Sequence, residues 1–261
     1  MKYGFIGCGN MGGSIAKALA KSTKDIVLSD PTEKAALLAQ ELGCTSGDNE
    51  TVISTCDCVF LAVKPQVMAD VLTPLQPYFE KYKPLVVSMA AGITVAKLEN
   101  LIGTSLPVIR IMPNTPVAVN SGMILYCHNC LVNDAILNTF LQEAVPCGQW
   151  DKLDEELIDA AGVVSGCGPA YMYMFIDALA EGAVACGVPK EKALMYAAAT
   201  MIGAAKMVQQ DGRTPVELKN AVCSPGGSTL AGVKVFDDNN FDKIVVDCVR
   251  AAYKRNQELG K

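Results

Sequence analysis

The chain has 261 residues, 51% hydrophobic and 19% charged, so it can bury a sizeable core and is not expected to be disordered. Its formal net charge of −5, without a basic run, argues against nucleic-acid binding. No apolar run reaches about 18 residues without a charge, because Glu181 interrupts the best candidate, so we expect no membrane span. Because the N-terminus enters a strand directly, we expect no signal peptide either, and predict a cytoplasmic protein.

The N-terminal stretch is typical of a strand, a glycine turn and a helix. Residues 3–6 form a short apolar run, and Gly7, Gly9 and Gly12 then fit the pattern G-x-G-x-x-G ahead of a helix. In this order the three glycines allow a tight turn, the approach of a pyrophosphate and close packing of the helix on the strand. A turn that only serves packing is the alternative, but the context favours dinucleotide binding.

An acidic residue follows the second predicted strand, at residues 25–29. Asp30 comes about 20 residues beyond the glycine motif, where a carboxylate can accept hydrogen bonds from the adenosine ribose of a dinucleotide. Asp30 and Pro31 also read as a helix start, ahead of a helix predicted over 33–42, and the two roles are compatible.

Further apolar segments extend the sheet, at 57–63, 85–89, 108–112 and 122–127, with 145–150 as a candidate last strand. The segment at 57–63 is nearly all apolar, as in a parallel strand covered on both faces. It leads into Lys64, at the edge where ligands of open α/β sheets lie, although a solvated surface lysine is the simpler alternative. Ala90, Ala91 and Gly92 follow the next strand and are small enough to let a cofactor ring pass.

Helix signals replace strands after about residue 151. Helices are predicted over 155–164, 169–186, 190–210, 215–222 and 241–259. Thr214 and Glu217 fit a capping box, and the helix at 190–210 has a wide alanine and methionine surface suited to packing within the chain or in a dimer. We therefore predict an α/β domain over 1–152, with a doubly wound parallel sheet, and an all-helical domain over 153–261.

The eleven cysteines and the single histidine offer little catalytic chemistry. Most cysteines lie in apolar runs, as Cys58 and Cys248 do, which is typical of buried free thiols in a reducing compartment. Cys127 and Cys130 flank His128 in a lone C-x-x-C motif, so we expect neither a metal site nor a structural disulfide. Reduction of a carbon–nitrogen double bond suits this set, because a protonated imine is already electrophilic.

A second glycine-rich turn lies between two helices at residues 223–230. Ser224, Ser228 and Thr229 surround Gly226 and Gly227 there. Hydroxyls and backbone N–H groups at a helix N-terminus make an anion site that suits a carboxylate. A structural turn with Ser/Thr capping is the alternative.

Six stretches along almost the whole chain match one enzyme family. They are GFIGCGNMG at 4–12, AVKPQ at 62–66, SMAAGIT at 88–94, RIMPNTP at 110–116, VSGCGPAY at 164–171 and ELKNAVCSPGGSTLAGV at 217–233. Together they resemble pyrroline-5-carboxylate reductase, and the last is similar to that family's signature. The resemblance implies a Rossmann-type domain, a helical dimerisation domain, homodimers that often form rings, and reduction of 1-pyrroline-5-carboxylate to proline by NADH or NADPH.

The resemblance also implies roles for individual residues. Thr229 would hydrogen-bond the substrate's ring nitrogen, with Lys64 and Glu217 nearby as further catalytic candidates, although the capping box explains Glu217 at least as well. The substrate would be held by Ser224, Gly226, Gly227, Ser228 and Thr229. The cofactor would be bound by Asp30 and by Gly7, Gly9, Asn10, Met11, Gly12, Ala62, Val63, Lys64, Pro65, Ala90, Ala91, Gly92 and Asn114.

Two rival functions stay open. A related imine reductase, or a β-hydroxyacid dehydrogenase that uses Lys219 or Lys234, would share the architecture but would not need the second glycine turn. A non-catalytic nucleotide sensor would need only the first glycine turn, at residues 7–12. For the cofactor, no arginine follows Asp30, and its carboxylate would repel a 2′-phosphate, so NADH is expected to be at least as good a donor as NADPH.

Overall fold

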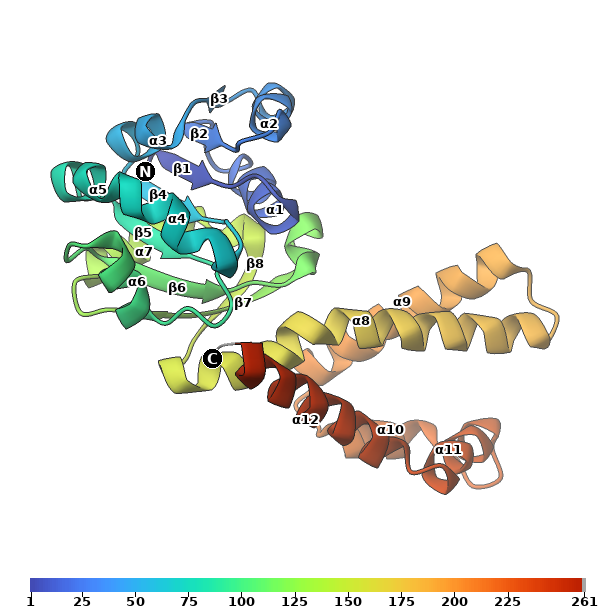
Figure 1. Ribbon diagram of the computed structural model, residues 1–261. Helices are drawn as coiled ribbons and strands as arrows, with labels where there is room; N and C mark the ends of the chain where they lie inside the picture. The colour runs from blue at the N-terminus through green and yellow to red at the C-terminus, as the bar shows by residue number, and fades with distance from the viewer. Residues whose placement is uncertain (260–261) are drawn as a thin grey trace. The chain divides into compact units, whose positions relative to one another are not determined.

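A computed structural model describes residues 1–259, which form two compact units (Figure 1). The first unit runs from Met1 to Cys167 and includes the chain from Tyr253 onward, and the second runs from Gly168 to Ala252. The sequence places a boundary at residue 152, whereas the compact units divide inside the helix that follows.

One eight-stranded sheet forms the first unit, in the order β3-β2-β1-β4-β5-β6-β7-β8. The strands are β1 (Tyr3–Ile6), β2 (Ile26–Ser29), β3 (Thr45–Ser46), β4 (Cys58–Leu61), β5 (Leu85–Ser88), β6 (Val108–Met112), β7 (Gly122–His128) and β8 (Gly148–Lys152). The six strands from β3 to β6 are parallel, in the order of a doubly wound dinucleotide-binding sheet.

The last two strands depart from the sequence prediction. β7 is antiparallel to β6, because the connection, with the 3₁₀ helix η3 (Thr115–Val119), is shorter than the dozen or so residues of a parallel crossover. The candidate strand at 145–150 is shifted to Gly148–Lys152, and Val145–Cys147 form a 3₁₀ turn, η4. Pro146 explains the shift, because proline has no N–H for the strand ladder.

Helices cover both faces of the sheet (Figure 1). One face carries α1 (Asn10–Leu19), α2 (Lys34–Leu42) and α7 (Asp134–Glu143), which bury Ile15, Leu38 and Phe140 in one cluster. The other face carries α3 (Asn49–Thr55), α4 (Met68–Leu72), α5 (Gln76–Tyr82), α6 (Val95–Ile102) and the short turns η1 (Pro65–Val67) and η2 (Thr73–Leu75). Since β4 is buried throughout and contributes to both clusters, the prediction of a strand covered on both faces is confirmed.

The sequence predicted two helices, over 155–164 and 169–186, but the structure has a single helix there, α8 (Glu155–Ala185). Pro169 has no N–H to donate to the carbonyl of Ser165, four residues earlier. The side chain of Asn114 donates to that carbonyl instead, with an Nδ2–O distance of 2.9 Å. A donor from outside the helix thus replaces the missing one, and α8 continues without a break.

A buried ion cluster fixes the first turns of α8 to the sheet. Arg110 of β6 is 1% exposed and lies 3.2 Å from Glu155 and 2.6 Å from Asp159, measured from guanidinium nitrogen to carboxylate oxygen. Glu155 also accepts the N–H of Val95, the first residue of α6. Because a buried charge that loses its partner is costly, these contacts hold α8 against β6. Arg110 was not among the residues that the sequence pattern indicated.

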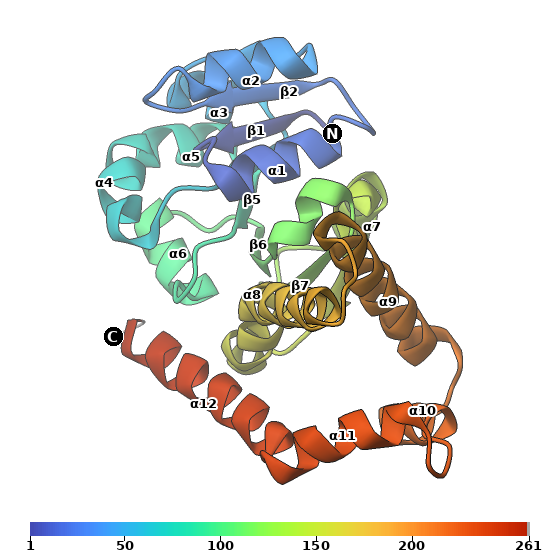
Figure 2. The ribbon, with the colours of Figure 1, turned by 90° about the vertical axis from the view of Figure 1, so that its right-hand side faces the viewer.

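The second unit contains the rest of α8 and the helices that follow (Figure 2). They are α9 (Lys190–Gln210), α10 (Pro215–Val222), α11 (Ser228–Asp238) and α12 (Phe241–Leu259), of which only the part up to Ala252 belongs to this unit. The bounds predicted for α9, α10 and α12 are confirmed, whereas α11 was expected only as the helix after a turn. The capping box is confirmed as well: Thr214 Oγ1 accepts the N–H of Glu217, and the Glu217 carboxylate accepts the N–H of Thr214.

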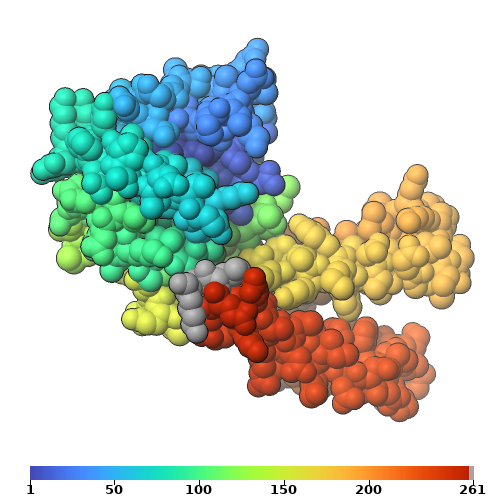
Figure 3. Space-filling view, viewed as in Figure 1, coloured from blue at the N-terminus to red at the C-terminus, as the bar shows by residue number. Residues whose placement is uncertain are grey.

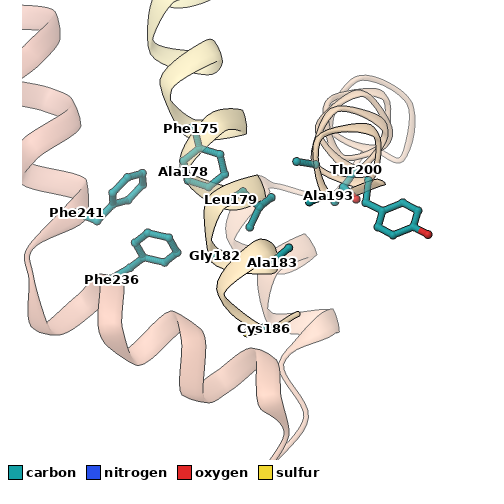
Figure 4. Close-up of a pocket in the computed structure, with 12 residues that line it drawn as sticks. Phe175, Ala178, Leu179, Gly182, Ala183, Cys186, Ala193, Thr200, Phe236 and Phe241 are labelled. Atoms are coloured by element: carbon teal, nitrogen blue, oxygen red, sulfur yellow. The ribbon is translucent and has the colours of Figure 1, made fainter. Parts of the chain in front are cut away.

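An apolar groove of about 650 Å³ lies within the second unit. In the space-filling view, the α8–α9 pair and the α11–α12 pair diverge on either side of open space (Figure 3). Phe175 of α8 faces Phe236 of α11 and Phe241 of α12, with Ala178 and Gly182 beside them (Figure 4). The aromatic rings and these small residues together line the groove.

α8 is also long and apolar enough to cross a membrane, judged by length and composition alone. Because Glu181 interrupts the apolar run, no membrane span was expected from the sequence, but this charge does not remove the helix from that class. Only 11% of its most apolar window is buried within the described chain. Cys248, expected to be buried, is exposed in this unit too.

Candidate active site

The glycine turn after β1 has the geometry that its motif predicts. Gly7 has a φ of +101°, and a Cβ there would lie 2.7 Å from the Ala62 oxygen. A Cβ on Gly12 would lie 2.5 Å from the Gly7 oxygen, so α1 packs closely on the turn. Nothing lies within 4 Å of the corresponding point on Gly9, and no side chain caps the helix that begins at Asn10. The open backbone and the N–H groups of the first turn therefore fit a pyrophosphate.

A cavity of about 500 Å³ adjoins this turn at the carboxyl ends of β1, β2 and β4. Its walls include Gly7, Asp30 and Val63, which the sequence singled out. They also include Ser29 and Asn49, which it missed, and the Ser29 hydroxyl donates to Asn49 Oδ1 at 2.7 Å. Only the polar start of α3 could have indicated Asn49 before the strand order was known.

Asp30 is held in place by hydrogen bonds to its carboxylate. The N–H of Cys8, inside the glycine turn, donates to Oδ2 at 2.8 Å, and Thr32 donates both its N–H and its hydroxyl to Oδ1. Burial acts to raise the pKa of Asp30, but the bonds from Thr32 and Cys8, with nearby Lys34, outweigh it and lower the pKa. α2 has Glu33 at its N-cap, so the expectation that Asp30 starts this helix is wrong.

The turns after β4 and β5 lie at the same edge of the sheet. Ala62 and Val63 follow β4 and lead to Lys64, which is exposed and precedes η1. The predicted cofactor residues Ala90, Ala91 and Gly92 come directly after β5 and Met89. Parallel strands β1, β4 and β5 bring these turns together with the glycine turn, as the sequence analysis expected.

Asn114 follows β6 but is buried, with 8% of its surface exposed. Its Nδ2 donates to the Ser165 carbonyl, and its Oδ1 accepts the N–H of Met123 in β7, both at 2.9 Å. Both ends of the amide therefore have partners within the fold. Its predicted role as a cofactor ligand stays a prediction.

The second glycine turn joins α10 to α11 within the helical unit. Gly226 has a φ of +74°, and Gly227 is the N-cap of α11. Because Gly227 has no side chain, no side-chain acceptor caps the N–H groups at the start of α11. Ser224, Ser228 and Thr229 are exposed at this end of the helix, beside a cavity of about 520 Å³.

Glu217 is engaged in the capping box rather than free. Its Oε2 accepts both the N–H and the hydroxyl of Thr214 at 2.8 Å. These bonds lower the pKa of Glu217, so its carboxylate is charged at neutral pH and is poorly suited to donate a proton. The geometry favours the capping interpretation over a proton relay.

Two buried thiols, Cys8 beside the sheet's ligand edge and Cys127 of the C-x-x-C motif, have little thiolate character. Burial raises the pKa of Cys8 to about 12 and that of Cys127 to about 11. Within residues 1–259, no cluster of three or more His, Cys, Asp or Glu side chains is arranged to hold a metal ion. His128 instead pairs its Nδ1 with the carbonyl of Asn129 at 2.9 Å.

Comparisons with known proteins cover both units. The chain is 36% identical over 266 residues to the pyrroline-5-carboxylate reductase of Escherichia coli, covering 100% of this chain and 98% of that protein. It is 39% identical over 263 residues to the reductase of Pisum sativum, covering 98% and 95%. This chain belongs to the pyrroline-5-carboxylate reductase family. The family model for pyrroline-5-carboxylate reductase dimerisation matches residues 155–259, and that for NADP oxidoreductase, coenzyme F420-dependent, matches residues 2–92.

Solved pyrroline-5-carboxylate reductases share the fold. Those of Plasmodium falciparum, with NADP bound, and Coxiella burnetii each have a TM-score of 0.90 at 30% identity, covering 100% of this chain and 98% of theirs. A ketol-acid reductoisomerase at 15% identity, with a TM-score of 0.64, shares the fold alone. The predicted family and fold class are confirmed, and membership makes this chain a nicotinamide-dependent oxidoreductase.

Proposed function

We propose that this chain reduces the carbon–nitrogen double bond of 1-pyrroline-5-carboxylate to give L-proline, the last step of proline biosynthesis. The observation that carries this proposal is the full-length match to curated pyrroline-5-carboxylate reductases, which includes both units. The nicotinamide cofactor, NADH or NADPH, supplies the hydride. The residues of the chain bind the cofactor and the substrate, orient them and provide charged groups.

At the sheet edge, the N–H groups at the start of α1 bind the pyrophosphate beside Gly9, where the backbone is open. Asp30 accepts hydrogen bonds from the adenosine ribose, since its carboxylate lines the adjoining cavity and stays charged. The small residues after β4 and β5 leave room for the rest of the cofactor along the carboxyl ends of the strands.

In the helical unit, the start of α11 binds the substrate. Its uncapped N–H groups and the hydroxyls of Ser224 and Ser228 suit the carboxylate. The Thr229 hydroxyl oxygen accepts a hydrogen bond from the N–H of the protonated ring nitrogen, which orients the C=N bond. Lys64 supplies positive charge at the sheet edge, and Glu217 keeps its structural role in the capping box.

Self-association completes the helical unit. The match to the dimerisation family and the open apolar groove together support a homodimer, and a ring of dimers is the larger assembly we propose. Burial of α8 in such a dimer accounts for its apolar faces without a membrane. We further propose that the enzyme acts in the cytoplasm and binds no nucleic acid, in keeping with its net charge of −5.

Steady-state turnover tests the proposal directly. With 1-pyrroline-5-carboxylate, the absorbance of reduced nicotinamide should fall and proline should form in equal amount. A hydroxyisobutyrate control should show no cofactor reduction. Turnover of the hydroxy acid without reduction of the imine would favour the rival β-hydroxyacid dehydrogenase, and turnover of neither substrate would remove the proposed activity.

A further inference from the structure

Asn114 connects the last part of the sheet to the start of α8 within the first unit. It lies two residues after the end of β6, at the ligand edge of the sheet, and its buried side chain joins β7 to α8. The bond to Met123 fixes the amide, with Oδ1 turned to that N–H. Nδ2 is thereby left to donate to the Ser165 carbonyl.

The Ser165 carbonyl needs this donor because of Pro169. In a helix without proline, the N–H four residues later would supply the bond. The carbonyl of half-buried Ser165 would otherwise lack its helical donor, so the amide of Asn114 substitutes for a main-chain group. Asn114 and Pro169 therefore act as a matched pair that lies far apart in sequence.

This bond is made where α8 rests on the end of β6. A Cβ on Gly162 would lie 3.1 Å from the Met112 side chain, so the helix packs closely there. Farther along the helix, the points where Gly166 and Gly168 would carry a Cβ have no atom within 4 Å, so this close packing is confined to the first turns of α8. These turns are therefore fixed against the same edge that carries the predicted cofactor turns.

We propose that Asn114 is a positioning residue: it clamps the Ser165 carbonyl that Pro169 leaves without a helical donor, and so fixes α8 against the cofactor edge of the sheet. This inference rests on the proposed function for its effect on catalysis. It is an alternative to the prediction that Asn114 binds the cofactor. Loosening the clamp should impair the alignment for hydride transfer while the binding of the cofactor stays unchanged.

The test uses the full-length protein with Asn114→Ala, Asn114→Asp, Pro169→Ala and the Asn114→Ala/Pro169→Ala double variant. Aspartate can still accept the Met123 N–H but cannot donate to Ser165, so both Asn114 variants should lower kcat about tenfold. The Kd for reduced cofactor, measured by fluorescence titration, should stay within about twofold. With Pro169→Ala, the helix regains its own donor, so the fall in the urea midpoint caused by Asn114→Ala should shrink, whereas kcat should stay low because the link from the sheet to α8 is still missing.

Asn129 offers a matched control at the opposite end of β6. Its side chain accepts the Val108 N–H and donates to the Leu106 carbonyl, so it also has partners at both ends. Asn129→Ala should lower the urea midpoint but leave kcat unchanged, which separates positioning at the cofactor edge from general loss of stability.

Two results would overturn the inference. One is a tenfold weaker cofactor Kd in Asn114→Ala with kcat retained, which would make Asn114 a ligand. The other is additivity of Asn114→Ala and Pro169→Ala in the urea midpoint, which would mean that the two residues are not coupled. Because that midpoint needs no substrate, the clamp is tested even if the protein proves inactive on 1-pyrroline-5-carboxylate.

Discussion

The two units of this chain are stabilised by different means. In the strand-rich unit, Phe5 and Phe60 are fully buried and stack with ring centroids 4.6 Å apart. In the helical unit, the buried cluster among the described residues consists of three alanines, Ala180, Ala193 and Ala197. The first unit encloses its own core, whereas the second leaves large apolar side chains exposed in the single chain. The comparison indicates that the second unit needs another surface to complete its core.

The largest expected effect comes from adding charge to the groove of the helical unit. Phe236→Glu should prevent self-association and lower kcat/KM at least about a hundredfold, because a carboxylate opposes burial of this surface. Leu131→Glu is the matched control, since each side chain is 45% exposed and Leu131 lies in the other unit. Sedimentation and steady-state assays give both readouts. An active monomeric Phe236→Glu protein would break the comparison.

In the strand-rich unit, two glycines should separate binding from stability. Gly9→Ala places its methyl group in open space, so Tm should hold, while cofactor Kd should weaken about thirtyfold as the pyrophosphate is displaced. Gly12→Ala meets the Gly7 oxygen and the Ala62 side chain, so it should also destabilise the fold by about 1–3 kcal/mol. Unchanged cofactor affinity in Gly9→Ala would mean that no pyrophosphate passes there.

The turn at α11 should show the reverse pattern, with catalysis affected and cofactor binding unaffected. Thr229→Ala should lower kcat/KM at least about tenfold, because a hydrogen bond to a charged group contributes about 1.5–3 kcal/mol. Thr139→Ala is the control, as its hydroxyl bonds only the Ala135 carbonyl within α7. Turnover at the wild-type rate in Thr229→Ala would remove this residue from the site.

The smallest effect concerns the choice of cofactor at Asp30. NADH should be at least as good a donor as NADPH, and Asp30→Ser should shift the ratio of kcat/KM values several-fold towards NADPH by removing like-charge repulsion. The solved relative with NADP bound makes this a demanding comparison. A tenfold advantage for NADPH in the unmutated protein would mean that the carboxylate serves only the turn.

The pH dependence of that choice follows from the pKa of Asp30. Since its pKa in the folded protein lies below the ordinary value of 3.8, the carboxylate stays ionised and its stabilising bonds persist above about pH 4. They are lost as the pH falls through the lowered pKa. Asp30 should therefore not change its own charge between about pH 5 and 8, so a change of cofactor preference in that range should follow the 2′-phosphate of NADPH, which titrates at about pH 6, and a change centred at another pH would assign the effect to another group.

Local patterns in the sequence determined most of the elements and the family. The strand–glycine–helix order gave the dinucleotide unit, because a buried parallel strand and a G-x-G-x-x-G turn each depend on neighbouring residues. The capping box and the breaks near residues 187 and 212 set the bounds of α9 and α10 for the same reason. The full-length motifs identified the family before any contact was known.

Tertiary structure decided what depends on residues distant in sequence. The short connection after β6 reverses β7, Cys8 fixes Asp30, and Arg110 gathers Glu155 and Asp159 from a helix that begins 45 residues later. Pro169 gives the clearest case: its local propensity predicts a break, yet α8 continues because Asn114 donates to Ser165. A propensity describes only the bonds that the segment itself can make, whereas the fold supplies donors and charges from elsewhere.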